Sequence, residues 1–417
     1  ASYEAEHPDI DLEGNLIFVP IGELNSKQVT MAAAGEAPDF FLGWSLPDWV
    51  EGGFIIPLDD YIKKDPWMYE YILPGAREVC KYGPTGDTIW GLPWTVDNFT
   101  YWYWDREKIT EAGIEPPGGI YTVEDMIDQC KSSQCTWDEV KRFVREIVEA
   151  GLGTVALDFT MTHREDKTEP NWRYMKIGEP KGKGGIYWEW REKDGVKKPY
   201  PVFNSPEGVK IVKWYVDLIA LGATPVMAGT SYDIDRAFLA GEYVLVESNN
   251  WISLTAKATI KLPVDEFFKK YGMFVNPVPE AGMPVCARGA TPLWCITAQS
   301  KHPDIAWEFL KILLSPKHLR LFNLEEGDIP IHSSEVYTPE WIKEFRKTVG
   351  PLADLYAAIP DQYVPPWVPN SEEADDIFMK KMQEIALAAQ QQGVLSEEEI
   401  KSMLDEAAET MKMIWGW

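Results

Sequence analysis

Tryptophan is the residue type that decides what chemistry this sequence could carry. The chain of 417 residues holds 19 tryptophans, and several of them stand near carboxylates or side-chain amides. Sugars present apolar C–H faces rimmed by hydroxyl groups, so a sugar site needs flat aromatic platforms with carboxylates and amides at their edges. Most tryptophans in any protein pack in a core, so each candidate requires a positional argument.

One candidate group ends a predicted strand. Asn249, Asn250 and Trp251 follow shortly after the apolar run 243–246 and together offer two amides and one indole. This mixture suits a ligand that is rich in hydroxyl groups.

A second group follows another predicted strand. Trp44 and Ser45 follow the short predicted strand 39–42, separated from it by Gly43. Open α/β sheets bind ligands at the carboxyl ends of their strands, so we expect Trp44 to contact ligand, against the alternative that it packs in the core.

The remaining candidates occupy turns and strand ends. Asp97 could instead cap a helix or lie in a solvated turn. Trp294 could be core or site, and Trp367 could be site or packing between lobes. The full set that we expect to bind ligand, besides Trp44, Ser45, Asn250 and Trp251, is Trp94, Asp97, Glu169, Asn171, Trp172, Arg288, Trp294 and Trp367.

These residues must be positioned by alternating helices and strands, which favours an α/β fold. The run Tyr101–Trp104 is predicted to be a mainly buried strand, because successive side chains face opposite sides. Residues 186–190 and 199–203 are predicted to pair as a hairpin on which Trp188 and Trp190 share one face. Apolar periodicity predicts the other elements: strands at 39–42 (of the kind found in parallel sheets) and 88–92, and helices at 29–34, 137–150, 209–220, 304–314 and 378–413, the last interrupted near Gly393.

Composition excludes several classes of function. The formal net charge of −26 argues against binding to nucleic acid or to an anionic membrane surface, since both need basic residues. The five histidines show no HExxH or other ligand spacing, so we expect no metal site. The sequence contains no P-loop, no GxGxxG motif and no GxSxG motif, so we expect no cofactor. A run of about 18 apolar residues, which a membrane-spanning helix would need, is also missing.

The five cysteines leave two readings open. Cys130 and Cys135 flank a polar turn and could close a small loop, and Cys286 and Cys295 could pair across a hairpin. Alternatively, all five, including Cys80, are buried free thiols.

The segment Tyr82–Pro117, reading YGPTGDTIWGLPWTVDNFTYWYWDREKITEAGIEPP, resembles one known family in the order of its parts. A glycine-led strand is broken at "GLP", an aromatic strand follows, and a short helix closes on "AGI-x-PP". The same arrangement is typical of the family 1 extracellular solute-binding proteins, the maltose-binding-protein-like sugar-binding subunits of ABC importers. Further motifs of that family match in the same order: AAGEAPD at 33–39, GFIIPLDDY at 53–61, AFLAGEY at 237–243 and NPVP at 276–279.

The resemblance implies a two-lobed fold of the type II periplasmic-binding class with a ligand cleft between discontinuous lobes. It places 1–97 and 273–314 in one lobe, and 98–272 and 315–417 in the other. It also implies a monomeric, extracytoplasmic binding protein, periplasmic or lipid-anchored, that hands a sugar or oligosaccharide to a membrane permease and performs no chemistry. On the same resemblance, Asp97 lies where the chain crosses between lobes, and Glu169 and Trp172 line the second lobe.

The first strand of that family has no counterpart at the start of this sequence. The chain opens with residues that resemble the helix after that strand. The apolar segment 413–417 has the character of the missing strand, which would make the chain a circular permutant; an N-terminal truncation is the alternative.

Three other functions are compatible with the sequence. The ligand could be a polyol, a phosphodiester or a peptide, although Arg288 is the one basic residue among the candidates. A glycoside-active enzyme also combines tryptophans with paired carboxylates, but the 66 acidic residues guarantee accidental pairs and no acid motif stands out. A receptor-like module with an empty cleft is the third alternative.

Overall fold

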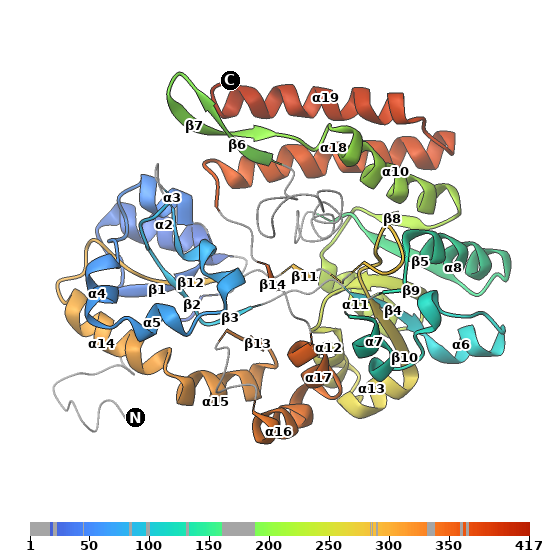
Figure 1. The fold of residues 1–417 in the computed structure, drawn as a ribbon, viewed down its shortest axis with the longest axis horizontal. Helices are drawn as coiled ribbons and strands as arrows, with labels where there is room; N and C mark the ends of the chain where they lie inside the picture. Colours follow the sequence, from blue (N-terminus) through green and yellow to red (C-terminus); the bar gives the residue numbers. More distant parts are fainter. Residues whose placement is uncertain are drawn as a thin grey trace.

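Two sheets of different size organise the molecule, one in each half of the view in Figure 1. We call the body around the three-stranded sheet the first lobe and the body around the five-stranded sheet the second lobe. The computed structural model describes residues 17–19, 23–44, 46–82, 86–96, 101–130, 133–160, 188–283, 285, 287–288, 291–331, 338–358, 362–363 and 367–417.

The sheet of the first lobe has the strand order β1-β12-β2. These strands are β1 (Phe40–Gly43), β12 (Leu293–Ile296) and β2 (Leu92–Pro93). The middle strand β12 runs antiparallel to both neighbours. The expectation of a parallel-sheet strand at 39–42 was therefore wrong. Its short apolar run gave no information on direction, because the partner strand lies some 250 residues away in the chain. The strand predicted at 88–92 is reduced to a single bridge at Ile89 followed by β2.

Helices cover this sheet, and they begin and end at the expected signals. Gly35 ends α2 in the left-handed conformation, and Pro303 opens α14. The helices of the first lobe are α2 (Leu24–Ala34), α3 (Leu46–Glu51), α4 (Asp59–Lys64), α5 (Trp67–Glu70) and α14 (Pro303–Leu313), with short 3₁₀ turns at Pro74–Ala76 and Glu78–Cys80.

The sheet of the second lobe has the strand order β10-β4-β9-β5-β8. Its strands are β10 (Tyr271–Val275), β4 (Tyr101–Asp105), β9 (Tyr243–Ser248), β5 (Thr154–Asp158) and β8 (Thr224–Val226). Strand β4 is antiparallel to both β10 and β9, whereas β5 is parallel to β9 and β8. All strands except β4 therefore run in the same direction. The aromatic run of β4 is fully buried, which confirms its prediction as core.

The helices of the second lobe agree with the predicted periodicity. The predicted helices 137–150 and 209–220 correspond to α8 (Trp137–Glu149) and α10 (Pro206–Ala220), each capped by a hydroxyl side chain at its start. The long C-terminal segment forms α18 (Ser371–Gln392) and α19 (Glu397–Ile414) with the break at Gly393. The other helices are α6 (Arg106–Glu111), α7 (Val123–Gln129), α11 (Ser231–Leu239), α12 (Ile252–Thr259) and α13 (Val264–Lys270), with a 3₁₀ turn at Pro117–Gly119.

The predicted hairpin is present, and its strands extend nearer to the turn than the predicted ranges 186–190 and 199–203. Strands β6 (Trp188–Lys193) and β7 (Val196–Pro201) pair so that Trp188 faces Pro201 and Trp190 faces Pro199. Strand β7 contacts α19, beside which it lies in Figure 1. The indole of Trp188 is buried and that of Trp190 is 42% exposed, and their rings meet edge to face, so they form no flat platform.

The apolar segment 413–417 is not the missing strand that the sequence suggested. Helix α19 continues through Ile414, and the indole N–H of Trp415 donates to the carbonyl of Pro369. Met413 and Ile414 end the helix, and Trp415 and Trp417 follow it, with the indole N–H of Trp417 donating to the carbonyl of Pro199.

Short strands and helices lie between the two lobes in Figure 1. Strand β3 (Thr95–Val96) pairs antiparallel with β13 (Ile329–Pro330), and β11 (Ala287–Arg288) pairs parallel with β14 (Gln362–Tyr363). Helices α15 (Pro316–Glu326), α16 (Pro339–Val349) and α17 (Leu352–Ala358) follow one another beside them. The predicted division of the chain into lobes stays a prediction; strand β10 spans one of its boundaries, at 272/273, and pairs along its whole length with β4.

Two further expectations concern the whole chain. Cys80, Cys130, Cys135 and Cys295 are buried free thiols, so no disulfide joins Cys130 to Cys135; Cys286 lies outside the described residues. Among the helices that the structure describes, none is long and apolar enough to cross a membrane.

Candidate functional site

The carboxyl ends of four strands meet at one edge of the second sheet. Because β5, β8, β9 and β10 run in the same direction, the residues that follow them emerge together, where β4 begins. Open sheets bind ligands at such an edge. We call the residues Asn249, Asn250, Trp251 and Asn276, which follow β9 and β10, the second edge.

Trp251 is held in place from three directions. Its backbone N–H donates to the Asn249 side-chain oxygen (3.1 Å), and its indole N–H donates to Oδ1 of Asp328 (3.0 Å). Its ring lies parallel to that of Tyr232, with centroids 6.3 Å apart. The indole is half-buried, so this predicted site residue is a fixed aromatic surface at the second edge.

The amide of Asn250 has an unusual environment for a buried polar group. The residue is 2% exposed, and neither its Oδ1 nor its Nδ2 has a hydrogen-bond partner among the described residues. The Oδ1 of the buried Asn276 is likewise unsatisfied within the described part of the chain. A buried amide without partners costs about 1–3 kcal/mol, so native proteins keep one only where something else meets it. A hydroxyl-rich ligand is one such partner.

Buried carboxylates fix the loops of the same edge. Asp158, the last residue of β5, accepts from the backbone N–H and hydroxyl of Thr160 (2.9 and 2.8 Å) and from the hydroxyl of Ser231 (2.5 Å). Asp235 accepts a hydrogen bond from the hydroxyl of Ser248. These bonds hold the carboxyl ends of β5 and β9 against α11. The segments that follow these two strands therefore start from fixed positions.

Three predicted tryptophans meet at one edge of the first sheet. Strands β1 and β2 both run antiparallel to β12, so they are parallel to each other, and their carboxyl ends flank the start of β12. Trp44 follows β1, Trp94 follows β2, and Trp294 lies in β12 between them. We call these three residues the first edge.

The indoles of the first edge combine ring contacts with unused donors. The rings of Trp94 and Trp294 meet edge to face, with centroids 5.8 Å apart. The indole nitrogens of Trp94 and Trp294 are both buried, and neither has a hydrogen-bond partner among the described residues. Trp44 is half-buried, and its backbone N–H is 3.5 Å from Oδ1 of Asn25.

The two edges are close along the chain. Trp94 and Tyr101, the first residue of β4, are seven residues apart, and an extended chain of this length spans at most about 25 Å. The chain therefore leaves the first edge and enters the second sheet at the second edge within that distance. The segment that it passes through holds Asp97.

Several predicted residues are not placed by the structure. Ser45, Asp97, Glu169, Asn171 and Trp172 lie outside the described residues, and of Arg288 only the backbone, in β11, is described. Trp367 is half-buried, and its indole N–H donates to the carbonyl of Val79 (2.7 Å), so its polar atom is used in contact with the first lobe.

Sequence reasoning missed four residues that this geometry brings in: Asn276, Tyr232, Asp328 and Phe322, whose ring lies against that of Trp94. Asn276 carried a signal, because it opens the NPVP segment directly after a predicted strand. The other three lie far along the chain from the residues that they contact, and their sequence context gives no sign of those contacts.

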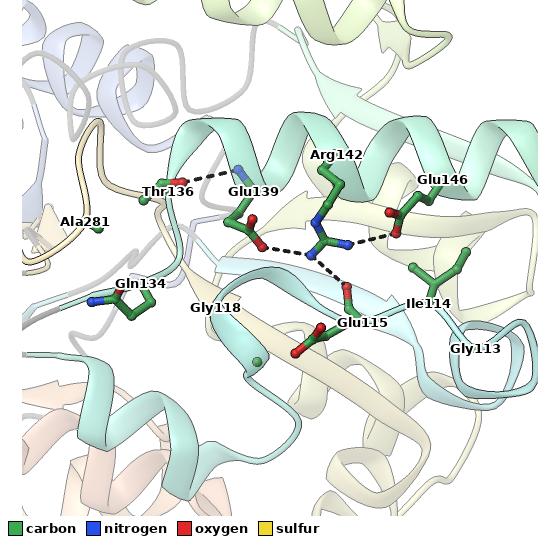
Figure 2. A pocket seen from close by; sticks show the side chains of 11 residues that line it. Gly113, Ile114, Glu115, Gly118, Gln134, Thr136, Glu139, Arg142, Glu146 and Ala281 are labelled. Carbon is green, nitrogen blue, oxygen red and sulfur yellow. Dashed lines mark hydrogen bonds and ion pairs between the residues drawn. The ribbon is translucent and has the colours of Figure 1, made fainter.

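A large cavity of about 790 Å³ lies elsewhere, on the second lobe (Figure 2). The guanidinium of Arg142 lies at its centre and bonds Glu139 and Glu146 (both 2.8 Å) and the carbonyl of Glu115 (3.0 Å). Burial lowers the pKa of Arg142, but the hydrogen bonds and charges of the two glutamates outweigh it and raise that pKa. The lining residues that the structure describes include no aromatic residue and no predicted site residue, so this lining does not suit a sugar. Among the described residues, no group of three or more His, Cys, Asp or Glu side chains could hold a metal ion.

Comparison with protein families gives a match over most of the chain. Residues 1–318 match the model of the bacterial extracellular solute-binding proteins. This chain belongs to that family. It is a solute-binding protein of the ABC transporter type, and the members of its family act by binding and not as enzymes. A comparison with curated proteins finds no significant match.

Solved structures of the same architecture cover nearly the whole chain. The GacH receptor of Streptomyces glaucescens, solved unliganded and with acarbose, has a TM-score of 0.72 at 18% identity and covers 100% of this chain and 93% of that chain. The sugar-binding protein MalE from Xanthomonas citri gives 0.68 at 17% identity, with 100% and 94% covered. A solute-binding protein from Agrobacterium radiobacter in complex with ribitol gives 0.60 at 17% identity, with 95% and 90% covered. These likenesses show the two-lobed fold of the periplasmic binding proteins, as predicted.

Proposed function

We propose that this protein captures a sugar or oligosaccharide between its two lobes, outside the cytoplasm, and delivers it to the permease of an ABC transporter. The observation that carries the proposal is the second edge, where the half-buried ring of Trp251 follows Asn250, whose buried amide has no hydrogen-bond partner in the described part of the chain. An aromatic face and free amide atoms are the two kinds of group that bind a sugar's C–H face and hydroxyl rim.

The first edge offers a second aromatic surface on the other side of the crossing segment. We propose that Trp44, Trp94 and Trp294 meet the same ligand from the first lobe, and that Asp97, Glu169, Asn171 and Trp172 add polar and aromatic contacts. A ligand that touches both edges stabilises the closed arrangement only by its higher affinity for that arrangement. Hinge motion about the crossing strands is the expected response, and the closed form is what a permease would recognise.

A polyol is the second candidate ligand, because a related fold was solved with ribitol and because a polyol presents the same hydroxyl groups. Stacking distinguishes the two, since an open polyol chain has no ring face to lay on Trp251. Catalysis is not part of the proposal.

A thermal-shift screen over monosaccharides, maltotriose and other oligosaccharides, and ribitol tests the proposal. Because a ligand at 100 times its Kd stabilises the folded state by about 2.7 kcal/mol, a true ligand should raise Tm by a few degrees. Calorimetry then gives the affinity, and chromatography after prolonged incubation shows whether the sugar is left intact. A screen in which ribitol alone raises Tm would replace the sugar by a polyol, and cleavage of the oligosaccharide would make the protein an enzyme.

A further inference from the structure

Asp328 lies in a segment that contacts both lobes. The segment runs from Phe322 in α15 to Ile331, just beyond β13. Its middle is in contact with the residue that the proposed function places at the centre of sugar binding: Oδ1 of Asp328 accepts the indole N–H of Trp251 at 3.0 Å.

The residue before Asp328 explains why the carboxylate can come so near. Gly327 ends α15 with a φ of +82°, and a Cβ added there would lie 2.8 Å from the side chain of Leu254 in α12 and 2.9 Å from that of Val349 in α16. A side chain at this position would therefore require a shift of Leu254 and Val349 or of the segment itself, and the positive φ would strain it in addition. Since Trp251 caps the start of α12, this close approach fixes the position of Asp328 relative to the indole.

The same segment is bound to the first lobe on its other side. Ile329 pairs with Val96 and Pro330 with Thr95, directly after Trp94. The backbone N–H of Leu73 donates to the carbonyl of Ile331 (2.8 Å). The segment therefore touches the first edge and the second edge within ten residues of chain.

We propose that Asp328 is the positioning residue for Trp251, which fixes the plane of the indole for sugar stacking and links that ring to the crossing strands β3 and β13. This inference rests on the proposed function for its ligand. Because the indole N–H is engaged by Asp328, Trp251 presents its ring face and not a hydrogen bond to the sugar. The ring of Tyr232 lies parallel to that of Trp251. The indole is therefore supported by a neighbouring ring as well as by the hydrogen bond at its N–H edge.

The link has a consequence for specificity. An indole with its N–H free could rotate to meet ligand hydroxyls in several orientations, whereas an indole fixed at its edge selects ligands by the apolar face of the ring that they present. Loss of Asp328 should therefore weaken binding of pyranose oligosaccharides and should narrow the difference in affinity between maltotriose and ribitol.

A cycle of four variants tests the proposal with maltotriose as the probe ligand. In Asp328→Ala the acceptor is gone, and calorimetry should show about tenfold weaker binding, the loss expected for a hydrogen bond to a charged acceptor. Asp328→Asn keeps a side-chain oxygen and should bind within about twofold of the parent. Trp251→Phe keeps a ring but has no N–H, so adding Asp328→Ala to it should cause no further loss.

A second measurement needs no ligand. In protein labelled with 5-fluorotryptophan, the ¹⁹F resonance missing from Trp251→Phe identifies Trp251. Asp328→Ala should shift or broaden this resonance, and Asp328→Asn should restore it, while the resonance of Trp190, assigned in the same way from Trp190→Phe, stays in place.

The outcomes separate the two claims. If the parent binds no sugar in the screen, the proposed function fails, and the ¹⁹F spectra still decide whether Asp328 holds the indole. The positioning role is wrong, while the function stands, if the parent binds maltotriose and Asp328→Ala binds it as tightly. It is also wrong if the affinity lost in Asp328→Ala adds in full to the affinity lost in Trp251→Phe. An unmoved Trp251 resonance in Asp328→Ala also overturns it.

Discussion

The ring of Trp94 lies against the ring of Phe322, with centroids 3.9 Å apart and planes 33° apart. Trp94 precedes the crossing strand β3, and Phe322 belongs to α15, which leads to the strand β13 that pairs with β3. The contact therefore closes a small unit in which two crossing segments and the first edge support one another. A change at Phe322 should affect both stability and the relation between the lobes.

Phe322→Ala should lower the free energy of unfolding by about 2–3 kcal/mol, because it removes a half-buried ring from a packed contact. It should also raise the radius of gyration of the ligand-free protein in small-angle X-ray scattering, since the crossing segments lose a contact. Phe309→Ala is the matched control: Phe309 contacts Phe40 within the first lobe. The control should lose stability without a change in radius of gyration; equal radii for both variants would assign Phe322 to local packing alone.

Trp251→Ala should weaken maltotriose binding by at least about tenfold, because it removes the ring on which we place the sugar. Isothermal titration calorimetry measures the affinity directly. Trp190→Ala removes an indole that is exposed on the hairpin β6–β7 and should leave the affinity unchanged. Unchanged affinity in Trp251→Ala would remove this residue from the site.

Asn250→Ala separates a binding role from a structural one. If the buried amide of Asn250 binds the ligand, its removal should weaken sugar binding. The free energy of unfolding of the ligand-free protein should stay the same or rise, because an unsatisfied polar group is removed. Urea denaturation and calorimetry give the two quantities. Asn204→Ala is the control: its Nδ2 donates to Asp405 (2.7 Å), so this variant should lose about 1 kcal/mol of stability and keep its affinity. A loss of stability in Asn250→Ala like that of the control would mean that the amide has a structural partner.

The sequence was a good guide to elements whose signals are local. Helix ends at Gly35, Ala220 and Gly393 follow from capping and periodicity, and the buried aromatic strand β4 follows from its composition. The direction of β1 was predicted wrongly, because strand direction is set by the partner β12, and nothing in a four-residue apolar run encodes it.

Some residues of the candidate site could likewise be predicted from local sequence, and others could not. Trp251 and Asn250 could be predicted because they follow an apolar strand, and strand ends gather at one edge of a sheet. Asp328 and Phe322 could not, since each acquires its role from a contact with a residue more than 70 positions away. Tertiary contacts of this kind depend on how α15 packs between the lobes, which no local pattern records.

Burial should make the described cysteines unreactive. Burial raises the pKa of the Cys130 thiol to about 12 and raises the pKa values of Cys80, Cys135 and Cys295 further. The thiolate is the reactive form, so Ellman's reagent at pH 8 should modify none of these four in the folded protein and all of them in guanidinium. A Cys286→Ser background restricts the assay to the four.

The raised pKa values of these thiols also determine how the stability of the protein changes with pH. A thiol whose folded pKa lies above its unfolded value stabilises the folded state below the unfolded pKa, near 9, and this contribution is lost as the pH rises toward 12. The free energy of unfolding should therefore fall above pH 9, and that of Cys130→Ala should fall less steeply than that of the parent.

Because no disulfide joins Cys130 to Cys135, dithiothreitol at pH 8 should leave Tm unchanged. Fewer than four reactive thiols in guanidinium, restored to four by dithiothreitol, would instead show a disulfide bond in the protein.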